Sequence, residues 1–278
     1  MKRMGTMILV LGLLLSAQSA LADWGAARRL TWTADASDTP AVAVGTTGSV
    51  HVAWSDYTPG NPEIYYKNSP YGGTTWGANK RLTWTAGSSQ TPAMGTGPGN
   101  AVHVAWSDDT PGNPEIYYRT SGDGGTVWNA VQRLTSTPGK SYSPALAISS
   151  GTTLYVVWED DTPGNYELHY RRSGNRGSTW AAVQRLTWTS GDSVSPTAAV
   201  DSSGSAHVAW SDYSTGNPDL YYRSRPAGSA TWNALQRLTW TLEDSAAPAM
   251  AVDTAGNIHI VWSDFTPGNY EVYYKRGT

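Results

Sequence analysis

The sequence predicts an all-β chain folded as a five-bladed β-propeller, and three observations carry that prediction. One unit recurs five times at a fixed interval of 52 residues. Each unit holds four short segments with strand-like patterning, which matches the size of one propeller blade. Apolar residues at the helical spacing of three and four are absent after the first 22 residues.

The repeat runs through the chain without insertions. One tryptophan marks each unit: Trp24, Trp76, Trp128, Trp180 and Trp232. A proline recurs at the same interval: Pro40, Pro92, Pro144, Pro196 and Pro248. We therefore predict a single domain over residues 23–278, built from five repeats that start at residues 24, 76, 128, 180 and 232.

Four strands are predicted in each unit, in a fixed order. The first is a run of small residues after the proline, such as "PAVAV", and the second is an alternating run that ends in Trp, such as "SVHVAW". The third is "EIYYK" and its copies, and the fourth follows the marker tryptophan, as in "WGANKRLTW". The 14 Trp and 16 Tyr, against one Phe, suit short half-buried strands because their rings combine an apolar body with a polar group.

The order of these segments predicts how the ring closes. The segment "WGAARRLTW" at Trp24 matches a fourth strand, whereas the last segment before Thr278 matches a third strand. We expect the N-terminal outer strand to join the C-terminal blade, which leaves the five-bladed ring without a free sheet edge.

The first 22 residues have the pattern of a secretory signal peptide. Lys2 and Arg3 precede the apolar run 7–15, and Ala20-Leu21-Ala22 forms a small-residue cleavage site. We expect a secreted or periplasmic protein, and no membrane insertion after cleavage. The chain has no cysteine, which excludes disulfides and thiolate metal sites. A net charge of −3 makes nucleic acid an unfavourable partner, and we expect a monomer.

One turn carries a family signature. Residues 121–128 read "SGDGGTVW", which resembles the Asp-box, or BNR repeat, of the sialidase-like β-propeller superfamily through Ser121, Asp123, Gly125 and Trp128. The aspartate carboxylate can accept hydrogen bonds from N–H groups that a tight turn leaves unpaired, and the glycine can adopt a positive φ. We therefore interpret this motif as structural. The copies diverge to "SPYGGTTW", "SGNRGSTW" and "RPAGSATW", and only the tryptophan is present in all of them.

The resemblance also implies what a sialidase would need. These groups are three arginines that bind the sugar carboxylate, a Tyr with a Glu partner as nucleophile, and an Asp as the acid/base. No arginine falls on a first strand or in the loops that lead into one, so the triad is not visible and no catalytic residue is assigned. One unit departs from the other four. The third carries Ser136, Lys140, Tyr142, Tyr155, Glu159, Asp161 and His169 in place of the usual residues. A hydrolase centred on Glu159, Asp160 and Asp161 is therefore kept as an alternative.

Repeated residues supply the candidate binding groups. The loops between second and third strands should share one face with the loops between blades, opposite the Asp-box turns. Four tryptophans are expected near the rim of this face, where a flat aromatic ring could stack on a sugar ring. They are Trp32, Trp84, Trp188 and Trp240. The polar candidates are Asp56, Asp108, Asp160, Asp212, Asp264, Asn61, Asn113, Asn165, Asn217 and Asn269. No metal or other cofactor is assigned, although each Asp and the acid across its hairpin could take Ca²⁺.

The leading functional expectation is a non-catalytic, lectin-like propeller that binds a glycan or cell-surface polysaccharide through up to five equivalent sites. A sialidase-like glycoside hydrolase is the first alternative. A scaffold that binds envelope proteins is the second.

Overall fold

The computed structural model describes residues 25–278, and the predicted signal peptide lies outside the described residues. The chain divides into a short unit that ends at Trp32 and a body from Thr33 to Thr278. Among residues 25–278 there is no helix, and therefore none of the length and apolarity needed to cross a membrane.

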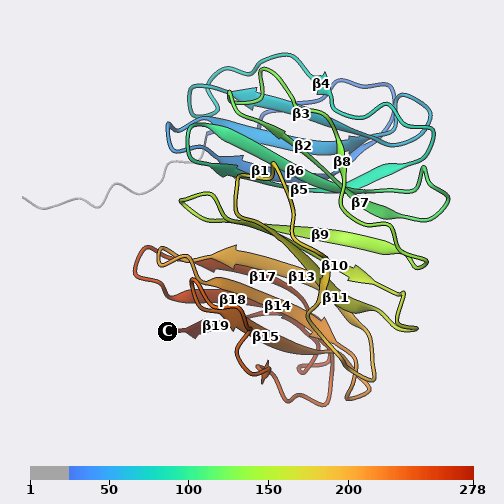
Figure 1. Ribbon diagram of the computed structural model, residues 1–278, viewed down its shortest axis with the longest axis vertical. Helices are drawn as coiled ribbons and strands as arrows, with labels where there is room; N and C mark the ends of the chain where they lie inside the picture. The colour runs from blue at the N-terminus through green and yellow to red at the C-terminus, as the bar shows by residue number, and fades with distance from the viewer. Residues whose placement is uncertain (1–24) are drawn as a thin grey trace, which may run out of the picture. The chain divides into compact units, whose positions relative to one another are not determined.

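The body consists of five antiparallel sheets that follow one another along the chain, as the colours of Figure 1 show. The first strands are β1 (Ser37–Val44), β5 (Ser89–Gly97), β9 (Ser141–Ile148), β13 (Ser193–Val200) and β17 (Ser245–Val252). The second strands are β2 (Val50–Asp56), β6 (Ala101–Asp108), β10 (Leu154–Asp160), β14 (Ala206–Asp212) and β18 (Ile258–Asp264).

The third strands are β3 (Glu63–Ser69), β7 (Glu115–Ser121), β11 (Glu167–Ser173), β15 (Asp219–Arg225) and β19 (Glu271–Gly277). The fourth strands are β4 (Lys80–Arg81), β8 (Gln132–Arg133), β12 (Gln184–Arg185) and β16 (Gln236–Arg237). Every sheet pairs its strands in sequence order, and the fifth sheet has three strands in the described residues. The predicted all-β architecture of repeated four-strand units is confirmed.

The fourth strands are shorter than the predicted nine-residue segments. Leu82 N donates to Ile64 O at 2.7 Å, but Ile64 N donates to the Thr83 hydroxyl at 2.8 Å rather than to a backbone carbonyl. The threonine side chain thus replaces one rung of the ladder and ends the regular strand after two residues.

A bulge bends each first strand beside its proline. The register of β1 on β2 shifts between Asp38 and Ala41, and Thr39 there has a φ of 46°. The same left-handed backbone recurs at Thr91, Ser143, Ser195 and Ala247. A proline cannot donate to the ladder, so an unpaired residue beside it is tolerated.

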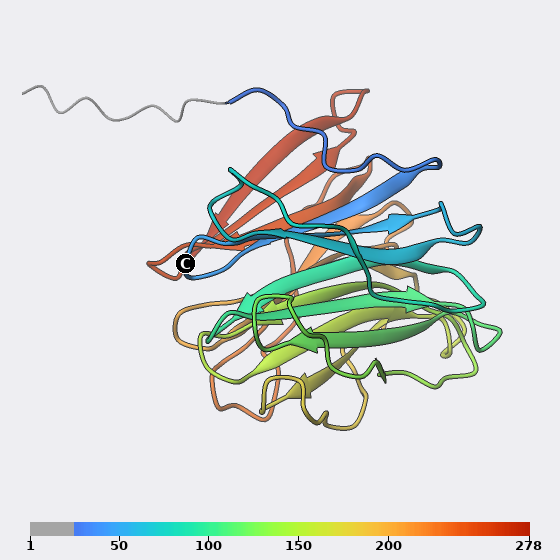
Figure 2. The same ribbon diagram turned by 90° about the horizontal axis from the view of Figure 1, so that it is seen from above.

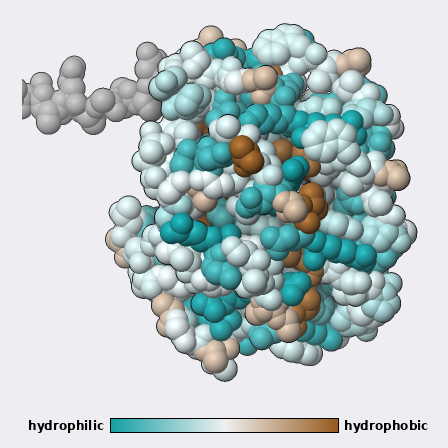
Figure 3. Space-filling model, turned by 45° about the horizontal axis from the view of Figure 1, so that its top comes forward, coloured by the Kyte–Doolittle hydropathy of each residue, from teal (hydrophilic) through white to brown (hydrophobic). Residues whose placement is uncertain are grey.

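The hydrophobic core lies between neighbouring sheets. The first and second sheets share a cluster that contains Ile64, Tyr66 and Leu82 from one and Val104 and Trp106 from the other. Equivalent clusters join each later pair of neighbouring sheets. Turned by 90°, the body shows its sheets stacked face to face (Figure 2). One face is largely hydrophilic, with hydrophobic residues gathered in a band across its middle (Figure 3).

Buried histidines make the stability of the fold sensitive to acid. Tyr118 Oη lies 2.6 Å from His103 Nδ1, and burial, helped by Arg176, lowers the pKa of His103 from 6.5 to about 4. The unfolded chain therefore binds a proton that the native imidazole does not.

We predict that the free energy of unfolding falls as the pH drops from 6.5 towards 4. His103→Tyr, which copies Tyr155 at the equivalent position of the third sheet, should flatten this dependence. Urea denaturation across that pH range measures both slopes, and equal slopes would contradict the assignment.

Candidate functional site

The two sets of loops expected on one face do meet there. Tyr57 N, between β2 and β3, donates to Ala36 O at 2.9 Å, and Asn61 Nδ2 donates to Thr85 O at 3.3 Å in the loop between the first and second sheets. We call this end of the sheets the loop face.

The repeated aspartates are buried and bonded to protein donors. The Asp56 carboxylate accepts from Ser37 Oγ at 3.0 Å, Trp54 Nε1 at 3.1 Å and Thr58 N at 3.1 Å. Burial alone would raise the pKa of Asp56, but the hydrogen bonds from Thr58, Trp54 and Ser37 outweigh it and lower the pKa. The serine contact recurs at Asp108, Asp160, Asp212 and Asp264. This set caps the loops.

The repeated asparagines tie loops to one another. Asn113 Nδ2 donates to Thr137 O at 3.2 Å, and Asn165 Nδ2 donates to Gly191 O at 2.6 Å. Asn217 Nδ2 reaches Glu243 O at 2.7 Å, whereas Asn269 Nδ2 donates to the Glu271 carboxylate at 2.7 Å. Their amides thus hold the loop face together.

Each aspartate faces an acid across the hairpin, as predicted. Asp56 pairs with Glu63 in the register of β2 and β3. Glu63 is fully buried and accepts from Arg81 at 2.8 Å and from Thr85 N at 2.9 Å. No three acids or histidines within residues 25–278 are arranged to hold a metal ion.

The rim tryptophans, which are Trp32, Trp84, Trp188 and Trp240, stand apart because they are exposed. Their exposed fractions are 67%, 67%, 66% and 68%. An arginine lies against each ring; Arg81 is 5.7 Å from the Trp84 ring centre. Trp84 also lines a cavity of 320 Å³ together with Tyr117 and Arg119 of the next sheet. Aromatic lining with a few polar groups is typical of ligand sites.

The turn at residues 121–128 is held by hydrogen bonds within itself. Asp123 Oδ1 accepts from Thr126 N at 3.0 Å and Val127 N at 2.9 Å, and Gly125 has a φ of 85°. The hydrogen bond from Val127 N has the largest effect, and together these bonds lower the pKa of Asp123. Ser121 Oγ accepts from Gly125 N at 2.9 Å. Trp128 packs on Tyr66 of the preceding sheet at 5.0 Å, so it fills the space between sheets.

The third sheet places an unusual acid on the loop face. Glu159 takes the strand position held by serine in the other four sheets: Ser55, Ser107, Ser211 and Ser263. Its Oε1 accepts from Ser143 Oγ at 3.0 Å, and its Oε2 accepts from Ser195 N at 2.8 Å. Both serines have the left-handed backbone of the bulges, so two neighbouring first strands position this carboxyl group.

The environment of Glu159 favours its protonated form. Burial raises its pKa and the nearby Asp192 adds to this, while the bonds from Ser195 and Ser143 act in the opposite direction. Of the described carboxyl groups whose pKa departs clearly from the ordinary value, only Glu159 has a raised pKa. A half-buried carboxyl group of this kind can hold a proton and deliver it.

Four groups, one of them Glu159, lie near Tyr166, and we call the five the Glu159 cluster: Glu159, Tyr142, Asp161, Tyr166 and Asp192. Burial and the charges of these neighbours raise the pKa of Tyr166. Asp192 Oδ1 accepts from Tyr166 N at 2.9 Å, and Asp161 Oδ1 accepts from Lys140 N at 2.6 Å. Asp160 instead belongs to the buried capping set, so the predicted acidic triplet separates into different roles.

One residue of the cluster, Tyr142, also lines a cavity whose other lining residues come from the second sheet and its loops. Tyr142 pairs with Glu159 across β9 and β10 and also lines a cavity of 230 Å³ with Asp109 and Thr91 of the second sheet. Sequence patterns identified Tyr142, Glu159 and Asp161 through the departure of the third unit. They missed Ser195, Tyr166 and Asp192. Tyr166 lies in the third unit and replaces the proline of Pro62, Pro114 and Pro218, whereas Ser195 and Asp192 follow that unit and contact it only in the folded chain.

The loop face is acidic. Its loops carry six carboxylates, Asp35, Asp109, Asp161, Asp192, Glu243 and Asp244, against the single ammonium of Lys140. Each fourth-strand arginine of the body lies instead beside a buried acid, as Arg81 does beside Glu63 at 2.8 Å. Between residues 33 and 278, the loops of this face contain no arginine that could hold a sugar carboxylate.

Comparison with known proteins gives similarity in structure only. No family model matches the chain, and no curated protein matches its sequence. The α-L-arabinanase of Penicillium chrysogenum, solved with arabinobiose, has 19% identity and a TM-score of 0.57 over 86% of this chain and 76% of its own.

Two further structures share the fold. The intramolecular trans-sialidase of Ruminococcus gnavus has 11% identity and a TM-score of 0.58 over 88% of this chain and 85% of its own. The endo-arabinase of Bacteroides thetaiotaomicron has 14% identity and a TM-score of 0.54 over 86% and 93%. The predicted likeness to sialidase-like β-propellers is confirmed at the level of the fold.

These comparisons correct the main functional prediction. We expected a non-catalytic, lectin-like propeller with equivalent sites, but the similar structures are enzymes that act on glycans. The glycoside hydrolase, kept above as an alternative, is the better supported interpretation. The prediction gave five similar surfaces more weight than the one unit that differs.

Proposed function

We propose that the protein is a glycoside hydrolase in which Glu159 is the general acid. The observation that carries the proposal is the raised pKa of this single carboxyl group, which replaces a serine found in four equivalent positions. Glycosidases need one carboxylic acid that protonates the leaving oxygen and one ionised carboxylate. Asp192, whose charge acts on Glu159, is the proposed ionised partner.

The charge of the loop face selects a neutral glycan as the proposed substrate. Six carboxylates against one ammonium repel sialic acids and uronates as they approach. No arginine of the loop-face loops within residues 33–278 offsets that repulsion, whereas a neutral chain has no charge to be repelled. Arabinans, which the arabinanases named above suggest, are the first substrates to test.

Release of reducing ends from polysaccharides tests this proposal. The purified protein should cleave at least one neutral chain and leave polygalacturonate and sialylated glycans intact. Glu159→Ser, which restores the residue of the other four sheets, is the matched variant and should be inactive. Cleavage that survives in Glu159→Ser would remove Glu159 from the chemistry.

We propose that the rim tryptophans stack on sugar units of the substrate beyond the Glu159 cluster. Trp84→Ala should raise KM severalfold and leave kcat and thermal stability nearly unchanged, because its ring is exposed. Ser136, which stands where the third unit lacks this tryptophan, supplies the matched control: Ser136→Ala should not change KM. An unchanged KM in Trp84→Ala would exclude this role.

Several finer predictions stay proposals. We propose that the sheets form one closed five-bladed ring, that residues 121–128 and their copies are Asp-boxes of the BNR type, and that residues 1–22 direct export to the periplasm or medium. Internal bonding of Asp123 supports the second of these. A monomeric state remains our expectation, as does a glycan rather than an envelope protein as partner.

A further inference from the structure

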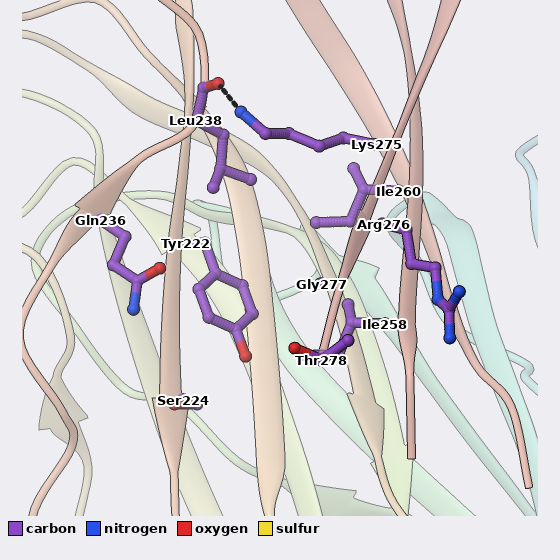
Figure 4. Close-up of a pocket in the computed structure, with 10 residues that line it drawn as sticks. All are labelled: Tyr222, Ser224, Gln236, Leu238, Ile258, Ile260, Lys275, Arg276, Gly277 and Thr278. Atoms are coloured by element: carbon purple, nitrogen blue, oxygen red, sulfur yellow. Dashed lines mark hydrogen bonds between the residues drawn. The ribbon is translucent and has the colours of Figure 1, made fainter. Parts of the chain in front are cut away.

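The cavities between neighbouring sheets differ in whether their polar groups have partners. Figure 4 shows a cavity of 340 Å³ between the fourth and fifth sheets, lined by Tyr222, Leu238 and Ile258 among others. The Tyr222 hydroxyl lies 2.6 Å from His207 Nδ1, and Lys275 Nζ donates to Leu238 O at 2.7 Å. These two polar groups therefore need no ligand to be satisfied.

The 320 Å³ cavity beside Trp84, between the first and second sheets, borders a donor without a partner. Five indole N–H groups among residues 25–278 lack an acceptor, and Trp106 is the one that lines this cavity. The Trp106 side chain is only 1% exposed. A buried donor without an acceptor costs free energy, so a partner from outside the chain is favoured there.

In the second sheet, the usual acceptor of this indole is held by a serine. The equivalent N–H groups donate to aspartates in three other sheets: Trp54 to Asp56, Trp210 to Asp212 and Trp262 to Asp264. There the aspartate oxygen lies 2.9–3.0 Å from its serine, whereas Ser89 Oγ lies 2.6 Å from Asp108 Oδ2. Asp108 also lines the cavity, so both ends of the missing bond border it.

Two further aromatic rings line the same cavity. Trp84 presents its exposed ring, and Tyr117 stacks on Trp106 with ring centres 6.1 Å apart and an angle of 21° between the planes. The C–H groups of a sugar ring can pack on such aromatic faces. An indole N–H is a donor only, so the ligand atom that it meets must be an acceptor, as sugar oxygens are.

The charged side chains of the lining are bonded to the protein. Arg119 donates from Nη1 to Leu82 O at 2.6 Å and from Nε to Asn129 O at 2.7 Å. The Asp108 carboxylate accepts from Thr110 N at 2.9 Å in addition to its serine. Because both charges are already engaged, the cavity favours a neutral ligand over an ion.

The repeat shows that this combination is specific to one junction. At the junction of the second and third sheets, Trp158 also lacks an acceptor, but Ser136 stands where the exposed ring would be. At the two later junctions Trp188 and Trp240 supply the ring, but the second-strand indoles there donate to aspartates. Among the junctions of consecutive sheets in residues 33–278, only the first joins an exposed ring to an unpartnered second-strand indole.

We propose that this cavity binds one sugar unit of a neutral glycan. The sugar ring stacks on Trp84, and one of its oxygens accepts from Trp106 Nε1. The choice of a neutral glycan rests on the proposed function, but the cavity lies at a different junction from Glu159, which contacts Ser195 of the fourth sheet. Binding can therefore be measured apart from cleavage.

Two exchanges of tryptophan for phenylalanine test the N–H group. Both are made in the full chain with Glu159→Ser, and binding is measured by affinity electrophoresis in gels that contain arabinan, arabinoxylan or mixed-linkage β-glucan. Trp106→Phe should weaken binding about threefold to tenfold, the usual effect of one hydrogen bond. Trp210→Phe, at the equivalent position of the fourth sheet, should leave binding unchanged.

Stability should respond in the opposite order. Both exchanges remove the same part of a buried ring, so the difference between them reports the N–H bond. Trp210→Phe removes a donor from Asp212, whereas Trp106→Phe removes a donor that has no partner in the chain. Urea denaturation should therefore find Trp210→Phe the less stable variant. Equal losses of stability would show that the protein itself satisfies the Trp106 N–H and would overturn the proposal.

The exposed ring has its own matched pair of variants. Trp84→Ala should weaken binding more than Trp188→Ala does, because only the first of these rings lies beside an unpartnered indole. Equal effects would assign binding to exposed rings in general and would remove the cavity from it.

The outcomes distinguish this site from the proposed catalysis. Unaltered binding in Trp106→Phe, or no binding of the Glu159→Ser protein to any of the three glycans, overturns the cavity even if the unchanged protein cleaves a neutral chain. Binding that is weakened in Trp106→Phe supports the cavity. The same result in a protein that cleaves no neutral chain would overturn the catalysis alone.

Discussion

Glu159→Gln should lower the turnover of a neutral glycan by about 10²–10⁴-fold, the usual contribution of a general acid. Glutamine keeps the size of the side chain, and its Oε1 can still accept from Ser195 N while its Nε2 donates to the Ser143 hydroxyl oxygen, but an amide cannot transfer a proton to the leaving oxygen. KM should change little because the surrounding cluster is retained.

The same variant should be more stable than the unchanged protein at alkaline pH. The native carboxyl group holds its proton to higher pH than the unfolded chain does, because burial raises its pKa. Stability is therefore lost as the pH rises from the ordinary glutamate pKa through the raised one, and glutamine abolishes this loss.

Activity of the unchanged enzyme should fall over the same pH window as Glu159 ionises. Matched profiles of turnover and of unfolding free energy measure both effects. An unaltered turnover in Glu159→Gln would contradict the assignment. So would a difference in unfolding free energy between the variant and the unchanged protein that stays constant as the pH rises.

Trp210→Ala should destabilise the body by about 3–5 kcal/mol, the typical cost of removing a large buried ring. Trp210 is fully buried between the third and fourth sheets, where it packs with Leu186 and Val208. Its Nε1 also donates to Asp212 at 3.2 Å, so the substitution leaves a cavity and removes one donor from the capped loop.

Trp188→Ala is the matched control, because the same side chain is 66% exposed there. Surface substitutions usually change stability by less than about 0.5 kcal/mol. Urea denaturation of the two variants compares the loss of unfolding free energy at the buried strand tryptophan with the loss at the exposed rim tryptophan. Similar losses of stability in both would show that the rim ring is also part of the packing.

The repeat made the strand order predictable, because four strand-like segments in every 52-residue unit match a four-stranded sheet whose strands pair in sequence order. The short fourth strands were not predictable, since the Thr83 hydroxyl replaces a backbone acceptor only in the folded sheet. The bulge at Thr39 was also missed, although the adjacent Pro40 was its signal.

Half of the candidate site followed from sequence. Glu159 and Tyr142 differ from their counterparts in all other units, whereas Asp161 shares its residue type with Asp109 of the second unit. Ser195 and Asp192 could not be found in that way, because they reach Glu159 from the next sheet through tertiary contacts. Asp56 and its copies were chosen as candidate binding groups because they recur beside the loops of one face, whereas burial and local hydrogen bonds give them a capping role.

The central claim is that one unit of a fivefold scaffold carries the chemistry. A crystal structure of Glu159→Gln soaked with a neutral oligosaccharide that the unchanged enzyme cleaves tests it most directly. We expect one bound chain with a glycosidic oxygen within hydrogen-bond distance of residue 159. Sugar density repeated at the rim tryptophans, with none at residue 159, would contradict it.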